Sequence, residues 1–478
     1  MNQPETASVI SSSTEVSSAE YFAQRQLKQG TVGWLLLIGL GVAYVISGDF
    51  AGWNFGIAQG GWGGMFIATA LAALMYLCLC LSMSEMSTMM PTAGGGYSFA
   101  RAAFGPFGGY LTGTAILIEY AIAPAAIAVF IGGYCESLFG INGWMIYLAC
   151  YAIFMGIHLK GAGEALKIMF AITLVAAVAL VVFIGAMIPH FNAQNLFDIP
   201  VSTGVGASLF LPHGYLGIWA AVPFAIWFFL AVEGVPLAAE EAKDPAKSLP
   251  RGLIGAMLIL TAFAMLILFL GAGAAGASTL QNSGAPLVDA LVKVYGTNTW
   301  LATFVNFVGL AGLIASFFSI IYAYSRQIFA LSRAGYLPTS LSLTNKNKAP
   351  YLAIIIPGII GFLLSLTKEG DSLILIAVFG ATISYVLILL SHIKLRLSKP
   401  DMPRPYKTPG GIITSSIALV LAVAAVVAGF VVNPKVWFIA AGIYVVFIAY
   451  FLFYSRYHLV KGTPEEEFAN IKATEQEL

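Results

Sequence analysis

A series of apolar runs, each about 20 residues long, constrains this 478-residue sequence more than any other feature. A run of that length is long enough to cross a lipid bilayer as one helix. The chain is 59% hydrophobic and 9% charged, whereas soluble domains carry about 25% charged residues. The sequence therefore predicts an all-α membrane protein whose surface faces lipid, with twelve transmembrane helices. The runs lie at 32–59, 63–85, 107–135, 142–158, 164–188, 216–235, 252–278, 300–325, 351–366, 372–393, 411–432 and 436–456.

Lysine and arginine set the expected orientation, because they are enriched in the loops on the cytoplasmic side of a membrane. If both termini lie inside, twenty of the 23 Lys and Arg residues fall in cytoplasmic segments, and only Lys293, Lys368 and Lys435 fall outside. We therefore expect a multi-pass protein of the cytoplasmic (inner) membrane with both termini in the cytoplasm. The net charge of +1 gives no reason to expect a nucleic-acid partner.

The polar segments divide the chain into four parts. Residues 1–30 predict a disordered cytoplasmic tail and no signal peptide, because the first apolar run is long enough to span the bilayer. Residues 31–395 hold the first ten spans, which form two five-span halves at 31–190 and 215–395. Residues 396–458 hold a linker and the last two spans, and 459–478 form a cytoplasmic tail. The four cysteines match no zinc or CxxC spacing, so we expect buried structural thiols.

Two spans are interrupted by residues that weaken a helix. The first contains ISGDFAG at 46–52, and the sixth contains WFFLAVEGVP at 227–236. Their acids, Asp49 and Glu233, each cost about 2.5–3.5 kcal/mol near the centre of a span. Interrupted helices at equivalent positions of two halves indicate a transporter site between inverted repeats. The alternative is that the glycines only permit close helix packing, but the added carboxylates argue against it.

A third acid, Glu119, lies about twelve residues into the third run and therefore near mid-bilayer. An ionisable group at that depth is a candidate functional residue. The alternative is a structural carboxyl group that is protonated or paired with a neighbouring helix.

Other classes of protein receive less support. A membrane enzyme would need a nucleophile or a metal cluster, but HExxH, GxSxG and Walker motifs are absent, and no two histidines have metal-ligand spacing. We therefore expect no catalytic residue, no metal and no cofactor. A membrane sensor without transport is a further alternative, although both tails are too short for a signalling domain.

Three ordered motifs resemble the amino acid–polyamine–organocation transporters over about residues 30 to 455. They are Glu85-Met86 with PTAGGGY at 91–97, EEAKDP at 240–245 with LPR at 249–251, and SR at 325–326 with RAGYLP at 333–338. Within that superfamily, the segments 47–65 (SGDFAGWNFGIAQGGWGGM) and 112–138 (TGTAILIEYAIAPAAIAVFIGGYCESL) resemble bacterial ethanolamine permeases.

The resemblance implies a LeuT-type fold, with five-plus-five inverted repeats, two extra helices and a central site between spans 1, 3, 6 and 8. Trp227 matches an aromatic gate of related exchangers, and Glu233 matches an acid common in their sixth span. Many relatives hold a substrate carboxylate on a Gly-Ser-Gly turn, but here Ile46-Ser47-Gly48 is followed at once by Asp49. A fixed carboxylate repels a substrate carboxylate and attracts an ammonium.

We therefore expect import of ethanolamine or a similar small amine without a carboxylate, by alternating access. In this hypothesis Asp49 and Glu119 form a negative pocket for the ammonium, and Trp227 and Phe229 close over it with cation–π support. Backbone groups of Gly48 or Ala231 would bind the hydroxyl. An amino-acid or polyamine permease of the same superfamily is the alternative. The complete candidate set is Ser47, Gly48, Asp49, Glu119, Trp227, Phe229, Ala231, Glu233 and Phe318.

The coupling ion is left open between H+ and Na+. Many relatives place a lysine in span five, where this chain has Thr173, so a lysine-based proton mechanism is not expected. Thr173, Ser316 and Ser319 are candidates for a sodium site, since hard cations take oxygen ligands, although such hydroxyls more often bond the preceding turn. Proton coupling or facilitated exchange is the preferred hypothesis, because mid-membrane acids can carry a proton.

Overall fold

The structure is a computed structural model, and it describes residue 27 and residues 30–296 and 300–460, without the side chains of 162–166. The predicted tails at 1–30 and 459–478 lie almost wholly outside these described residues. Within them the chain is helical and has one isolated β-bridge, between Val32 and Ala242. The longer helices are α2 (Trp34–Val45), α4 (Asn54–Met89), α5 (Gly96–Phe139), α6 (Trp144–His158), α7 (Ala162–Met187), α8 (Gly214–Trp227), α9 (Pro245–Ala275), α11 (Pro286–Tyr295), α12 (Trp300–Arg333), α13 (Tyr351–Ser365), α14 (Gly370–Ser398), α15 (Ile412–Val432) and α16 (Pro434–Phe453).

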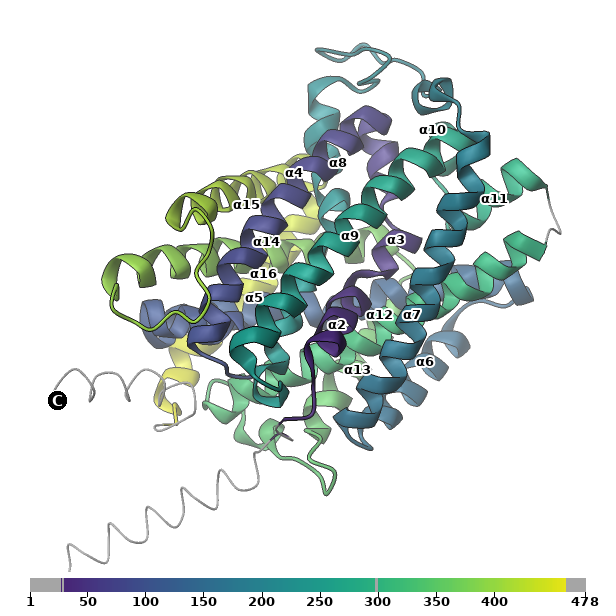
Figure 1. Cartoon of the computed structure of the whole chain (residues 1–478). Helices are drawn as coiled ribbons and strands as arrows, with labels where there is room; N and C mark the ends of the chain where they lie inside the picture. Colours follow the sequence, from purple (N-terminus) through teal and green to yellow (C-terminus); the bar gives the residue numbers. More distant parts are fainter. Residues whose placement is uncertain (1–26, 28–29, 297–299, 461–478) are drawn as a thin grey trace, which may run out of the picture.

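Each of the twelve predicted runs coincides with an apolar helix (Figure 1). In the described part of the chain, nine helical segments are long and apolar enough to cross a membrane, and α2, α6 and α13 are shorter apolar helices. Two boundaries differ from the sequence prediction. Helix α4 joins the end of the first run to the second across Gly61, whose φ of 68° lets the chain turn. Helix α5 begins at Gly96, before the run predicted at 107, and bends at Gly105 with φ 74°.

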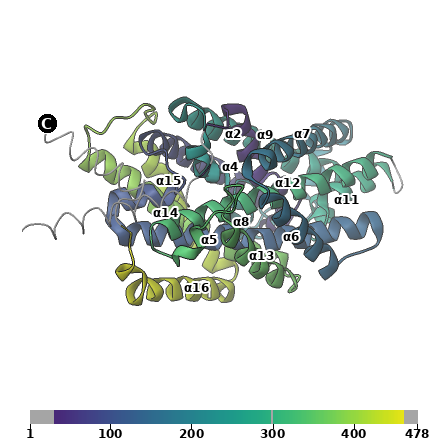
Figure 2. The same cartoon turned by 90° about the horizontal axis from the view of Figure 1, so that it is seen from below.

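The helices pack as one bundle with the last two at its edge. Helix α14 lies along α5, α4 lies along α8 and α9, and α12 contacts α5 and α7. Helix α16 lies on the outer side of the bundle in Figure 2. Many of its large apolar residues, such as Phe438, Val445 and Val446, are exposed, which suits a surface that faces lipid acyl chains.

Both interrupted spans are broken helices in the structure. Helix α2 ends at Val45, the four-residue helix α3 (Ser47–Phe50) follows, and Gly52 adopts φ 98° before α4 begins. Helix α8 ends at Trp227, Ala231 adopts the left-handed conformation with φ 78°, and the 3-10 helix η3 (Val232–Glu241) follows. Alanine rarely adopts positive φ, so the surrounding packing must hold this break.

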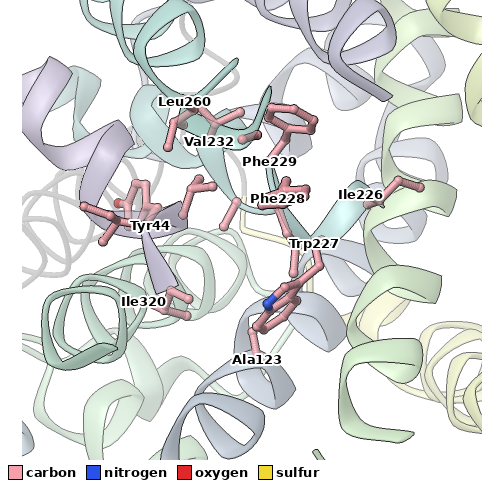
Figure 3. Close-up of a cluster of buried hydrophobic side chains, with 14 of the residues drawn as sticks. Tyr44, Ala123, Ile226, Trp227, Phe228, Phe229, Val232, Leu260 and Ile320 are labelled. Carbon is pink, nitrogen blue, oxygen red and sulfur yellow. The ribbon is translucent and has the colours of Figure 1, made fainter. Parts of the chain in front are cut away.

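An apolar cluster surrounds the break in the sixth span (Figure 3). Tyr44 of α2, Ala123 of α5 and Ile320 of α12 lie around the segment from Trp227 to Val232. Every one of these side chains is at most 3% exposed. The interior at the two breaks is therefore closed to solvent in this structure.

The backbone before α2 is joined to the end of η3. The N–H groups of Thr31 and Val32 donate to the carbonyl oxygen of Glu241 at 2.9 and 3.0 Å, and Lys243 N–H donates to the Val32 carbonyl at 2.8 Å. The first and sixth spans are thus connected through main-chain hydrogen bonds that do not depend on side-chain identity.

Candidate functional site

Asp49 is a buried carboxylate at the break of the first span. It lies in α3 with no exposed surface, and neither of its side-chain oxygens has a hydrogen-bond partner among the described groups. A buried polar group without a partner costs free energy, so this position is one where a ligand would restore the lost interaction. We therefore take Asp49 as the centre of the candidate site.

The two breaks approach each other closely at Gly48. A Cβ atom there would lie 2.6 Å from the carbonyl oxygen of Trp227, so any larger residue would separate the first and sixth spans. The indole Nε1 of Trp227 donates to the carbonyl oxygen of Ala51 at 3.0 Å. Both halves of the predicted site are therefore brought together, with Trp227 bonded directly across them.

Aromatic rings complete the closure beside Asp49. Phe228 stacks on Trp53 with ring centroids 5.8 Å apart, and Phe130 meets Trp227 edge-to-face at 6.3 Å. Trp227 itself is 3% exposed. Phe228, Trp53 and Phe130 were not among the sequence candidates, although the aromatic run at 227–229 was a usable signal for Phe228.

Ser316 of α12 compensates the break in the first span. Its hydroxyl oxygen accepts the Ser47 N–H at 2.9 Å and donates to the Ala43 carbonyl at 2.7 Å. These are backbone groups that a continuous helix would satisfy internally. Ser319 donates instead to the Ser316 carbonyl at 3.0 Å, and Thr173 donates to Met169 at 2.8 Å.

Glu119 lies beside Glu233. The two carboxyl groups interact across the interface between α5 and η3, and Tyr120 donates its hydroxyl hydrogen to Glu233 Oε1 at 3.1 Å. Both oxygens of Glu119, and Oε2 of Glu233, receive no hydrogen bond from a described donor. The expectation was a pocket shared by Asp49 and Glu119, whereas the groups acting on Glu119 in the structure are Glu233, Tyr385 and Ala231.

Close packing of α14 on α5 positions this carboxyl pair. A Cβ at Gly380 would lie 2.8 Å from the Glu119 nitrogen, so α14 approaches α5 at that level. Tyr385 of α14 shares a 2.8 Å hydrogen bond with Tyr76 of α4. Sequence reasoning missed Tyr76, Tyr120 and Tyr385. Their hydroxyls within apolar runs were the available signal, since tyrosine in a membrane helix is enriched at the interfaces.

Two further candidates face other parts of the bundle. The ring of Phe318 lies 4.2 Å from that of His158 in α6, and the Phe318 carbonyl contacts His158 Nε2 at 2.7 Å. Phe229 packs on Tyr76 at 5.5 Å. The structure therefore places Phe229 toward the Glu119–Glu233 pair, and it describes no contact of Phe318 with Asp49 or Trp227.

The acids near the ends of the helices are all paired with arginine. Arg326 contacts Glu241 at 2.8 Å with both side chains 2% exposed, and Arg333 contacts Glu240 at 2.7 Å. The Tyr322 hydroxyl also donates to Glu241. These ion pairs join η3 to α12, and sequence reasoning did not find them.

Glu85 at the end of α4 is held in the same way. Its carboxylate contacts Arg396 at 2.5 Å and Arg404 at 2.9 Å, and it accepts the Thr408 N–H at 2.7 Å. The contacts fix the α14–α15 linker to the second span. As for metals, the described residues contain no group of three His, Cys, Asp or Glu side chains that could bind one.

Paired broken helices within an apolar bundle define the molecule as a multi-span membrane protein with an enclosed central site. Residues 30–453 match the family described as Amino acid permease. The chain belongs to the amino acid permease family, and it is a transporter rather than an enzyme. The family implies a LeuT-like fold.

Similar proteins include two permeases with described substrates. The branched-chain amino acid permease BcaP of Bacillus subtilis is 27% identical over 412 residues, which cover 80% of this chain and 84% of the relative. The aromatic amino acid transport protein AroP of Escherichia coli is 25% identical over 397 residues, covering 79% and 84%. An uncharacterized transporter of Rhizobium meliloti is 27% identical over 392 residues, covering 80% and 83%.

Proposed function

We propose that this permease imports a small amine that lacks a carboxylate, with ethanolamine or a close amino alcohol as substrate. It is a secondary transporter with twelve spans arranged as a LeuT-type five-plus-five repeat and two further helices. Both termini lie in the cytoplasm, in keeping with the distribution of Lys and Arg. Alternating access at the two broken helices carries the substrate past Trp227.

The unpartnered carboxylate of Asp49 is the observation that carries this proposal. A substrate ammonium bound there would supply the missing charge and hydrogen bonds. An amino acid would bring its own carboxylate close to Asp49, and like charges repel strongly in a buried site. Ser316 already bonds the Ser47 N–H, so one backbone donor that could hold a substrate carboxylate is occupied.

Amino-acid import is the second candidate, and the relatives favour it. The names of BcaP and AroP describe branched-chain and aromatic amino acids, and no ethanolamine carrier is among the relatives described above. Apolar side chains such as Phe228 and Phe130 near the breaks would suit an amino acid of either kind.

Competition in liposomes separates the two candidates. Purified protein is reconstituted, and uptake of labelled ethanolamine is measured against excess alanine, leucine, phenylalanine, choline and putrescine. We expect unlabelled ethanolamine to compete and the amino acids to fail. Saturable uptake of leucine or phenylalanine that ethanolamine does not reduce would establish the second candidate.

A further inference from the structure

The pair formed by Glu119 and Glu233 is the most unusual charged feature that the proposed substrate site leaves unexplained. Glu119 lies on the continuous helix α5, and Glu233 is the second residue of η3, directly after the break. Their side chains are 0% and 3% exposed. The two carboxyl groups interact with each other, yet both lie within an apolar bundle.

The surroundings of the pair contain hydroxyl groups rather than cations. Groups that act on it come from four elements: Tyr44 of α2, Tyr76 and Cys80 of α4, Tyr120 of α5 itself and Tyr385 of α14. The Arg326 guanidinium acts on Tyr44, but it is ion-paired with Glu241 at 2.8 Å. The charge on the carboxyl pair is therefore not balanced by a described lysine, arginine or histidine in contact with it.

Two carboxylates in contact at a site without a cation do not both ionise, because their charges repel in a low-dielectric interior. One shared proton removes the repulsion and converts an acceptor–acceptor contact into a hydrogen bond. The unfilled acceptor positions on Glu119 and on Glu233 Oε2 are consistent with a proton between the two groups. The same proton would leave Tyr120 free to donate to Glu233 Oε1, as observed.

We infer that Glu119 and Glu233 together bind the proton whose movement is coupled to transport. This inference rests on the proposed function as a secondary transporter, and it names the coupling ion and its site. The break at Ala231 allows η3 to move relative to α5, and that movement changes the distance between the carboxyl groups. The pair holds the proton while the groups are together, and it releases the proton when they separate and water reaches them.

The proton site is distinct from the ammonium site. Desolvation is the only influence resolved on Asp49, so it is not in strong electrostatic contact with Glu119 or Glu233. Substrate exchange and proton coupling should therefore respond to different substitutions. Coupling through this pair also explains how a chain with Thr173 in place of a lysine in the fifth span can use a proton.

The test compares exchange with accumulation in liposomes. Glu119→Gln and Glu233→Gln are reconstituted beside the wild type, with Glu136→Gln at the exposed end of α5 as a matched control. Counterflow of labelled substrate measures binding and alternating access without net proton movement. Accumulation driven by an imposed pH gradient, and acidification of the lumen reported by an enclosed pH dye, measure coupling.

We expect each Gln variant to keep at least half of wild-type counterflow and to lose at least tenfold in accumulation and acidification, while Glu136→Gln keeps both. Glu119→Asp should recover part of the coupling, because it restores an ionisable group. Parallel loss of counterflow and accumulation in both Gln variants would overturn the inference in favour of a substrate-binding or structural role. Wild-type accumulation driven by a sodium gradient, without lumen acidification, would overturn it whether or not the variants fold.

The same measurements keep this inference separate from the proposed substrate. If the wild type moves leucine or phenylalanine and not ethanolamine, the substrate proposal fails, and the counterflow and accumulation assays are run with the amino acid. The proton site then stands or falls on those assays alone.

Discussion

The centre of the bundle and its proposed cytoplasmic end treat buried acids in opposite ways. At the centre, Asp49 and Glu119 have no hydrogen-bond partner on either oxygen, and Glu233 has one on a single oxygen. At the end, Glu85 and Glu241 are equally buried, yet each contacts at least one arginine within 3 Å. Both regions lie in the same apolar fold, so burial alone does not decide whether an acid is paired.

The contrast separates acids that hold the fold from acids that are available to ligands. A paired acid stabilises one arrangement of helices, and removal of its partner leaves a costly buried charge. An acid without a partner gives the fold no such contact and persists where a ligand completes it. The following predictions test this division, from the largest expected effect to the smallest.

Removal of the unpaired charge at Asp49 should abolish most transport without harm to the fold. Loss of one partner of a buried charge pair costs about 2–5 kcal/mol of binding, which corresponds to at least about 30-fold weaker uptake of ethanolamine. Asp49→Asn should show this in liposomes and keep a wild-type unfolding temperature in detergent. Asp401→Asn, at an exposed position of the α14–α15 linker, is the control. Uptake by Asp49→Asn within twofold of wild type would contradict the assignment.

Removal of Arg326 should have the reverse profile and act mainly on stability. Arg326→Met leaves Glu241 buried without its guanidinium, at a cost of about 3–5 kcal/mol, which should lower the thermal midpoint in detergent. Arg326→Met combined with Glu241→Gln should recover part of the loss.

The control for that pair is the exposed ion pair of Lys247 and Asp244, at 3.3 Å with side chains 71% and 56% exposed. Lys247→Met should change stability by less than about 1 kcal/mol. Equal effects of Arg326→Met and Lys247→Met would mean that burial of the pair does not matter.

Arg404→Gln should destabilise the protein less than Arg326→Met does. Glu85 would lose the 2.9 Å contact with Arg404 but keep Arg396 and the Thr408 N–H. The loss of one charged hydrogen bond is worth about 1.5–3 kcal/mol. Limited proteolysis at the α14–α15 linker should speed up with little change in ethanolamine uptake. A collapse of uptake at unchanged stability would move Glu85 into the functional group of acids.

The smallest effects should separate the two serines of α12. Ser316→Ala removes both hydrogen bonds to the broken first span, each worth about 1 kcal/mol, so uptake should fall about tenfold. Ser319→Ala removes a bond within its own helix and should change uptake less than about twofold. Equal losses, together with stimulation of the wild type by sodium, would restore both serines as ligands of a coupling ion.

The sequence predicted the positions of helices and breaks better than it predicted their partners. Apolar runs of bilayer length define helices without further information, and the glycines and acids at 46–52 and 227–236 mark real breaks. Gly61 was not recognised as the turn within α4, because its positive φ serves the return of the chain rather than a change in composition.

Contacts between helices were beyond the sequence for a physical reason. A membrane helix is apolar on all sides, so its pattern does not show which side faces a given neighbour. The proximity of Glu119 to Glu233 and of Arg326 to Glu241 depends on the rotation of whole helices about their axes. The same uncertainty explains why Phe318 was expected at the site and lies against His158.

The main-chain bonds between Thr31, Val32 and the end of η3 have a mechanical consequence. The N-terminal half of the first span and the C-terminal half of the sixth are fastened to each other, so they form one rigid body during a transport cycle. Opening toward the cytoplasm then requires only one set of contacts to break, namely the ion pairs of Glu240 and Glu241 with α12. The barrier to that opening is set by two arginines rather than by the substrate site.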